Sequence, residues 1–205
     1  MQLQSTNGIY KKAYVESLRN AEQYAKDAEN LIQQKSYGHA LAFCILGEEE
    51  LIKALLFLGA SYGIIPKKDM SMLQKEISCG GRAHLIKLLL SWTLSVTTLN
   101  QLKQFIARKS EFEEQLRKFI RKGKGFPEIQ EKQRMKLQGL YVDIKDKKVI
   151  SPFEITKELS ITSLSSLNKS IQDVKKYAEL IEDQPIVRSI LKMVFQKGFD
   201  FVKNL

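Results

Sequence analysis

Three consecutive glutamates interrupt an otherwise apolar helical segment of this chain. Residues 36–63, SYGHALAFCILGEEELIKALLFLGASYG, are broken in the middle by Glu48, Glu49, Glu50 and Lys53. A helix that is apolar on every side lies inside a protein, and a carboxylate does not enter the interior without a partner. Lys53 follows Glu49 by four residues and Glu50 by three, so either carboxylate can bridge to it. An exposed pair contributes only about 0.3–0.5 kcal/mol, so we expect further partners for these charges.

His39, Glu50 and Lys53 of this segment share one stripe of the helix. At 100° per residue the stripe contains His39, Phe43, Leu46, Glu50, Lys53 and Phe57. A histidine and an ion pair therefore lie on a line that is otherwise apolar. We expect this face to border a cleft or a second subunit. The alternative, which the sequence leaves open, is a face that reaches solvent between neighbouring helices.

The second candidate cluster surrounds one of the two histidines. His84 precedes Lys87 by three residues, in the first turn of an apolar helix expected at 82–99. The positive end of a helix favours neutral imidazole, which can accept a proton. If this helix packs antiparallel against the segment at 36–63, an acid, a base and a cation meet in one pocket. A buried histidine that only satisfies a neighbouring carboxylate is the alternative.

Several other chemistries lack their motifs. The chain has no phosphate-binding glycine loop, no nucleophile elbow and no His-Glu-x-x-His zinc motif. It also lacks the repeated Glu-x-x-His pairs of di-metal bundles. Cys44 and Cys79 have no metal-binding or disulfide spacing, so we expect both to be ordinary small apolar residues. We therefore expect no cofactor and no metal.

Nearly the whole chain has helical periodicity. The main helices are expected at 9–34, 36–63, 82–99, 102–121, 128–138, 152–182 and 184–202, with a shorter piece at 69–77 and an interruption near 160–166. Residues 139–144 and 147–150 predict two short extended segments around a polar turn. The predicted fold class is all-α, a helical bundle with a short β-hairpin-like insertion near 140–150, in one domain over 1–205.

Positive charge is concentrated in the middle of the chain. The net charge of +10 arises from 33 basic and 23 acidic residues. The densest run contains Lys103, Arg108, Lys109, Arg117, Lys118, Arg121, Lys122 and Lys124, and a second cluster contains Lys132, Arg134, Lys136, Lys145, Lys147 and Lys148. Such a run is typical of a surface that binds nucleic acid or another polyanion. A solvated helix face that aids solubility is the alternative.

The apolar runs do not predict a membrane protein. Each is interrupted by charge well before the roughly 20 residues that cross a bilayer. The first 20 residues lack the basic and apolar regions of a signal peptide. We therefore expect a cytoplasmic protein that does not bind membranes.

Three motifs in this order resemble the AbiV-type abortive infection family, an all-helical group of the HEPN superfamily. They are HALAFCILGEEELIKALLFLG, then RAHLIKLL, then KQRMKLQGLYVD before Ser151-Pro152. The family's Glu-Glu-Leu-Gly-Lys pattern matches Glu49 to Lys53, with Ile52 at the glycine position. Its His-x-x-Lys pattern matches His84 and Lys87. Its Leu-Tyr-Val-Asp pattern matches residues 140–143.

The resemblance implies a HEPN-like helical bundle that blocks phage propagation by acting on RNA or translation. It also implies a homodimer, and a phage protein as a trigger. Many HEPN proteins are metal-independent ribonucleases with an Arg-x4–6-His motif, which neither histidine here completes. The candidate catalytic residues are instead Glu49, Glu50, Lys53, His84, Lys87, Arg134, Tyr141 and Asp143.

Two functions remain open from the sequence. In the first, the chain is a ribonuclease in which His84 is the base, Lys53 or Lys87 binds the phosphate and Glu50 is the acid. In the second, the ion network only fixes helix register, and the basic run at 103–124 binds RNA, ribosomes or a phage protein.

Overall fold

The computed structural model describes residues 6–66, 69–70, 127–145, 148–189, 191–192 and 195–196. The helices expected at 82–99 and 102–121 lie outside these residues. So do His84, Lys87, Cys79 and the basic run at 103–124.

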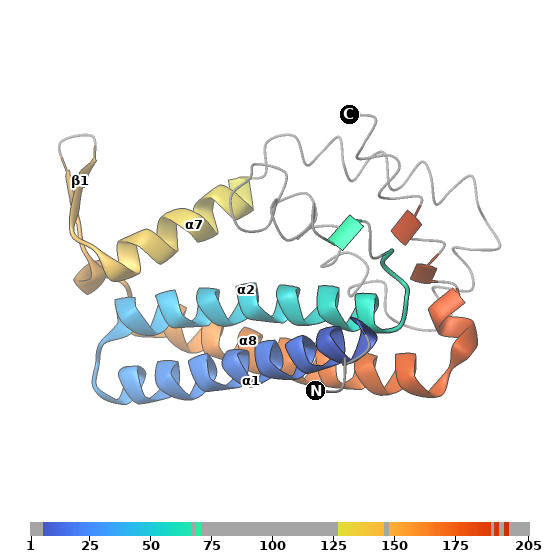
Figure 1. Ribbon diagram of the computed structural model, residues 1–205. Coiled ribbons are helices and arrows are strands. Elements are labelled where there is room, and N and C mark those ends of the chain that lie inside the picture. Colours follow the sequence, from blue (N-terminus) through green and yellow to red (C-terminus); the bar gives the residue numbers. More distant parts are fainter. Residues whose placement is uncertain are drawn as a thin grey trace, which may run out of the picture. The chain divides into compact units, whose positions relative to one another are not determined.

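The described chain is helical apart from one small hairpin, so the all-α prediction is confirmed (Figure 1). The elements are α1 (Thr6–Gln33), α2 (Tyr37–Ser61), α7 (Pro127–Leu140), β1 (Asp143–Lys145), β2 (Lys148–Ile150), the 3-10 turn η2 (Pro152–Glu154) and α8 (Lys157–Asp183). The two strands are antiparallel, and Ile144 lies opposite Val149. The predicted hairpin is therefore present, with shorter strands than expected.

Contacts divide the chain into two compact units. The first consists of Met1–Lys12, Leu55–Phe126 and Lys176–Leu205. The second consists of Ala13–Ala54 and Pro127–Lys175. Helices α1, α2 and α8 each contribute residues to both units. The single-domain prediction stays a prediction.

In the second unit, α1, α2 and α8 lie side by side around a core of small and aliphatic side chains (Figure 1). The core face of α1 carries only alanines at its most buried positions, Ala21, Ala25 and Ala28. The other helices contribute larger groups: Leu41, Ile45 and Leu51 from α2, and Leu167, Ile171 and Val174 from α8. A Cβ on Gly47 would lie 2.7 Å from the end of the Leu167 side chain, so a larger residue there would require Leu167 to move where α2 meets α8.

Two glycines allow α7 to lie against the start of α2. A Cβ added to Gly139, near the end of α7, would collide with the carbonyl oxygen of Gly38. A Cβ added to Gly38 would in turn collide with Pro152 of η2. Close to this contact, Leu41 and Ile45 pack against Ile155. The hairpin is thus anchored at its base by a backbone contact that excludes larger residues.

Helix α8 continues through the serine-rich stretch where we expected an interruption near 160–166, and that prediction is wrong. Ser160 is fully buried, and its hydroxyl lies 2.8 Å from the Tyr37 carbonyl oxygen and 3.2 Å from that of Thr156. Because the hydroxyl bonds to α2 and to its own preceding turn, it does not compete with the hydrogen bonds of the helix.

In the first unit, α2 ends as its sequence predicts. Gly63 has a φ of 66°, a conformation that glycine adopts without strain, and the Ile64 amide donates to the Gly59 carbonyl oxygen at 2.8 Å. Lys11 and Glu182 form an ion pair of 3.1 Å. The Arg188 guanidinium lies 5.4 Å from the centre of the Tyr62 ring.

Replacing Gly139 by alanine tests the contact between α7 and α2. We expect Gly139→Ala to lower the free energy of unfolding by about 1–3 kcal/mol, since the new methyl group overlaps backbone that cannot move freely. Urea denaturation monitored by circular dichroism measures this loss. Gln133→Ala, at an exposed position of α7, is the control and should change stability by less than about 0.5 kcal/mol. Equal stability of both variants would contradict the packing described here.

Candidate functional site

Each of the three consecutive glutamates of α2 has a lysine partner, and the three partners differ. The ion pairs are Glu48 to Lys132 at 2.5 Å, Glu49 to Lys136 at 2.8 Å and Glu50 to Lys53 at 2.6 Å. Of the two bridges expected for Lys53, the structure contains the one to Glu50. The sequence predicted further partners for these charges, and α7 supplies them as Lys132 and Lys136.

The two lysines of α7 hold this helix against α2. Lys132 and Lys136 are four residues apart, so they lie on one face of α7 and reach two neighbouring glutamates. The Glu49–Lys136 pair is the more enclosed, with 27% and 15% of the side chains exposed. Lys132 is 55% exposed and Glu48 is 22% exposed, so the lysine end of that pair lies at the rim. These pairs position α7 on α2.

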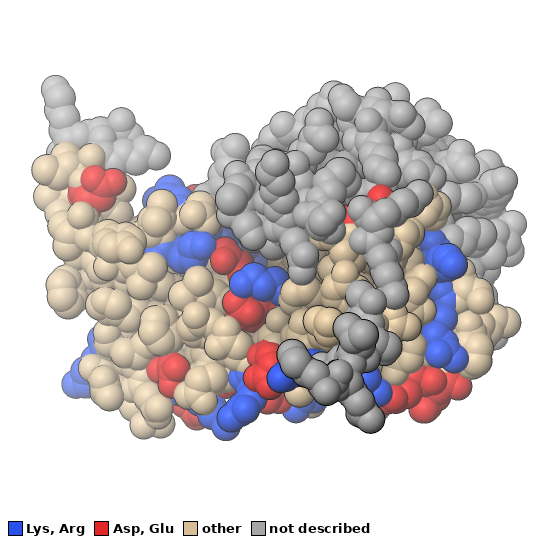
Figure 2. All heavy atoms as spheres, viewed as in Figure 1, with Lys and Arg blue, Asp and Glu red and all other residues tan. Residues whose placement is uncertain are grey.

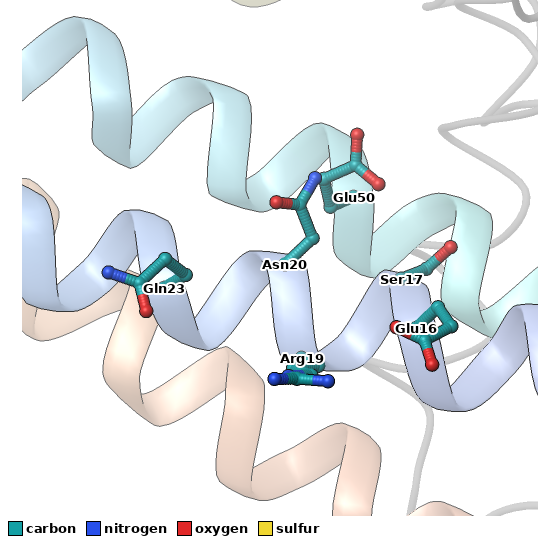
Figure 3. A pocket seen from close by; sticks show the side chains of 6 residues that line it. All are labelled: Glu16, Ser17, Arg19, Asn20, Gln23 and Glu50. Atoms are coloured by element: carbon teal, nitrogen blue, oxygen red, sulfur yellow. The ribbon is translucent and has the colours of Figure 1, made fainter.

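Glu50 faces the opposite neighbour, α1. Its side chain is only 15% exposed, and it lines a pocket of about 500 Å³ in the second unit. The remaining lining residues all come from α1: Glu16, Ser17, Arg19, Asn20 and Gln23. Figure 3 shows Asn20 reaching from α1 to the side of Glu50. The polar stripe of α2 therefore borders a cleft, which was one of the two expected environments.

The other stripe residues have structural partners. Phe43 packs edge to face against Tyr24 of α1, with ring centres 5.6 Å apart. His39 lies in the first turn of α2, and its Nδ1 is 2.9 Å from the hydroxyl of Ser36. The Ser36 carbonyl oxygen accepts the first backbone hydrogen bond of α2, from the Ala40 amide, so Ser36 occupies the N-cap position. His39 thus belongs to the helix start.

The remaining described candidates lie on outer surfaces. Arg134 pairs with Glu131 within α7, and its side chain is 46% exposed. Tyr141 is 61% exposed at the base of the hairpin. Asp143 accepts a hydrogen bond of 2.7 Å from the backbone amide of Ile144. The structure therefore keeps Glu49, Glu50 and Lys53 together on α2 and directs Arg134, Tyr141 and Asp143 to other contacts.

The described surface mixes both signs of charge. Figure 2 shows Lys and Arg side chains interspersed with Asp and Glu side chains on the visible face, over the residues that the structure describes. Basic residues that the sequence assigned to a possible polyanion surface, Lys132 and Lys136, are instead paired with glutamates. Within the described residues, a basic surface formed by α7 is thus partly neutralised.

The helical architecture and the α2 motif are matched by a known family. The family model of AbiV, HEPN_AbiV, matches residues 9–173. The chain belongs to the AbiV family. The match runs from α1 to the middle of α8 and includes the three glutamates, the pocket and the hairpin. No curated protein and no solved structure matches the chain significantly.

Membership of the AbiV family gives this chain a HEPN-type role in abortive infection. Among the described helices, none has an apolar stretch sufficient to cross a membrane. No group of three or more His, Cys, Asp or Glu side chains in the described part is placed to hold a metal ion.

Cys44 of this AbiV family member is a buried thiol on α2, one helical turn before Glu48. Its side chain is 1% exposed. Burial, together with the nearby charge of Glu48, raises the pKa of Cys44 to about 12. A thiol with that pKa is neutral at physiological pH and is a poor nucleophile. Cys44 is therefore a small core residue, as the sequence predicts.

Unequal burial of the two interhelical pairs predicts unequal effects on stability. The two carboxylates are similarly enclosed, but the Lys136 side chain is 15% exposed and that of Lys132 is 55% exposed, so water replaces the cation less readily beside Glu49. We therefore expect Lys136→Met to lower the free energy of unfolding by about 1–2 kcal/mol. Lys132→Met at the exposed rim should cost less than about 1 kcal/mol. Urea denaturation of both variants measures the difference. A larger loss for Lys132→Met would contradict the assigned burial.

Alkylation tests the state of Cys44. In a Cys79→Ser background, we expect folded protein at pH 8 to resist iodoacetamide, because the thiol is buried and protonated. Mass spectrometry should detect modification only after unfolding in urea. Rapid modification of the folded protein would show that Cys44 is accessible and reactive.

Proposed function

We propose that this AbiV family protein is a metal-independent ribonuclease of abortive infection, with Glu50 and Lys53 as its functional pair. The main support for this proposal is the position of Glu50. Glu48 and Glu49 are paired with lysines of α7, whereas Glu50 pairs within its own helix and faces a pocket. A half-enclosed ion pair beside a pocket is suited to contact a bound substrate.

The proposed reaction needs three groups. A base removes the proton of the ribose 2′-OH, whose oxygen attacks the phosphorus, and an acid donates a proton to the leaving 5′-oxygen as its bond to phosphorus breaks. A cation stabilises the charge that develops on the phosphate. Lys53, 42% exposed, is available to the phosphate. Glu50 is assigned the role of acid, which it fills in its protonated form after Lys53 has turned from it to the phosphate. His84, outside the described residues, is assigned the role of base, and Lys87 is the alternative cation.

The proposal includes a setting and partners. We place the activity in the cytoplasm, in a homodimer that a phage protein triggers. Support for a dimer comes from one face of the hairpin, where Val142, Ile144 and Val149 are 65%, 74% and 58% exposed. Exposed aliphatic groups gathered in this way are typical of an interface.

A second candidate function is a binding module without catalysis. It is favoured by the two pairs to α7, because such pairs are sufficient to fix one helix on another. In that case the basic run at 103–124 would bind RNA or a protein of the translation machinery.

Cleavage of RNA without metal tests the first proposal. Purified protein is incubated with total cellular RNA in EDTA, with extract of phage-infected cells as the source of the trigger, beside Glu50→Gln and the control Glu48→Gln, all shown to be folded by thermal melting. Extract and RNA without the protein are the blank. We expect cleavage by the native protein and by Glu48→Gln, and a loss of at least about 100-fold for Glu50→Gln, because a proton-transfer group is removed.

Cleavage by Glu50→Gln at the native rate would contradict the assignment. Absence of cleavage by all three proteins favours the binding module. In that case, neutral substitutions of Lys118, Arg121 and Lys122 should abolish RNA binding, whereas Glu50→Gln should mainly lower stability.

A further inference from the structure

The pocket beside Glu50 contains polar groups that the proposed reaction does not use. Ser17 and Asn20 lie one helical turn apart on α1, and Arg19 and Gln23 complete that wall. Ser17 is buried, whereas Asn20 and Arg19 are exposed to the pocket and to solvent. The volume of about 500 Å³ is within the range of small-ligand sites, about 300–1,000 Å³.

The charges around this pocket are balanced, which restricts its occupant. Glu16 and Glu50 contribute two negative charges, and Arg19 together with the adjacent Lys53 contributes two positive charges. A purely cationic ligand would meet Arg19 and Lys53, and a purely anionic ligand would meet Glu16 and Glu50, so neither is favoured throughout the pocket. A neutral group with hydrogen-bonding edges, attached to an anion that reaches a cation, fits the arrangement better. A nucleotide has this combination of a neutral base and a charged phosphate.

The amide of Asn20 gives the site a preference among bases. It presents one donor group and one acceptor, and it forms no side-chain hydrogen bond with any residue that the structure describes. An asparagine amide forms two hydrogen bonds with the edge of adenine. Gln23 is less available, because its Nε2 donates to Asp27 at 2.9 Å. Figure 3 shows Asn20 directed to the part of the pocket where Glu50 lies.

We propose that this pocket binds an adenine nucleotide of single-stranded RNA, with Asn20 pairing with the base and Arg19 contacting a phosphate. The inference rests on the proposed function for the choice of RNA as ligand. It names the base that is held next to the Glu50–Lys53 pair.

Binding of short RNAs tests this proposal. Fluorescence anisotropy compares fluorescein-labelled oligo(A) with oligo(C) of the same length, both 2′-O-methylated so that the proposed reaction, which needs a free 2′-OH, cannot cleave them; the full chain is used. We expect the native protein to bind oligo(A) about tenfold more tightly than oligo(C). Asn20→Asp should remove this preference, since a carboxylate cannot donate a hydrogen bond to adenine. Arg19→Gln should lower the affinity for both RNAs by the same factor, because a phosphate contact does not depend on the base.

Asn30→Asp is the matched control, because it makes the same chemical change at an exposed position of α1 outside the pocket. It should leave both affinities as in the native protein. Equal binding of oligo(A) and oligo(C) by the native protein, or a preference that survives Asn20→Asp, would overturn the proposal. So would Asn20-dependent binding of a labelled arginine-rich peptide in place of RNA.

This measurement is separate from the test of cleavage. A preference for oligo(A) that depends on Asn20, in a protein that does not cleave RNA, would refute the ribonuclease and support the pocket. Cleavage that depends on Glu50, without any preference for adenine, would support the ribonuclease and refute the pocket assignment.

Discussion

Three consecutive carboxylates in an apolar helix impose the constraint on which the described structure depends. Consecutive residues of a helix point about 100° apart, so no single neighbour can satisfy all three. In this protein α7 supplies lysines to Glu48 and Glu49, and α2 itself supplies Lys53 to Glu50. The need to pair these charges therefore determines which helices surround the middle of α2.

Close backbone packing, in addition to the ion pairs, fixes α7 on α2. The contact between Gly139 and Gly38 brings the end of α7 against the start of α2, while Lys136 and Lys132 meet α2 about one and two turns earlier in α7, respectively. A helix held at several points along its length is fixed in register. The hairpin follows directly after this contact, and its aliphatic face is exposed. On the other side of α2, the small alanines of α1 allow close packing, and the polar pocket lies between these two helices.

Local patterns in the sequence predict much of this arrangement. A bridge from Lys53 to Glu49 or Glu50, a polar stripe beside a cleft, the end of α2 close to Gly63 and the hairpin all follow from spacing over a few residues. The roles of Lys132 and Lys136 were missed, because their partners lie more than 80 residues away and no local rule connects them. Their spacing of four residues, equal to one helical turn, was the available signal. The prediction of an interruption near Ser160 was wrong, because the Ser160 hydroxyl donates a tertiary hydrogen bond to the Tyr37 carbonyl oxygen. Contacts of this kind cannot be derived from residue type alone.

A phage infection assay tests most directly whether Glu50 serves function while Glu48 serves structure. Cells expressing the native chain, Glu50→Gln or Glu48→Gln at equal levels of folded protein are challenged with a phage that the native chain restricts. The account predicts that plating efficiency is restored to that of unprotected cells by Glu50→Gln and stays low with Glu48→Gln. Restriction by Glu50→Gln equal to that of the native chain would contradict it.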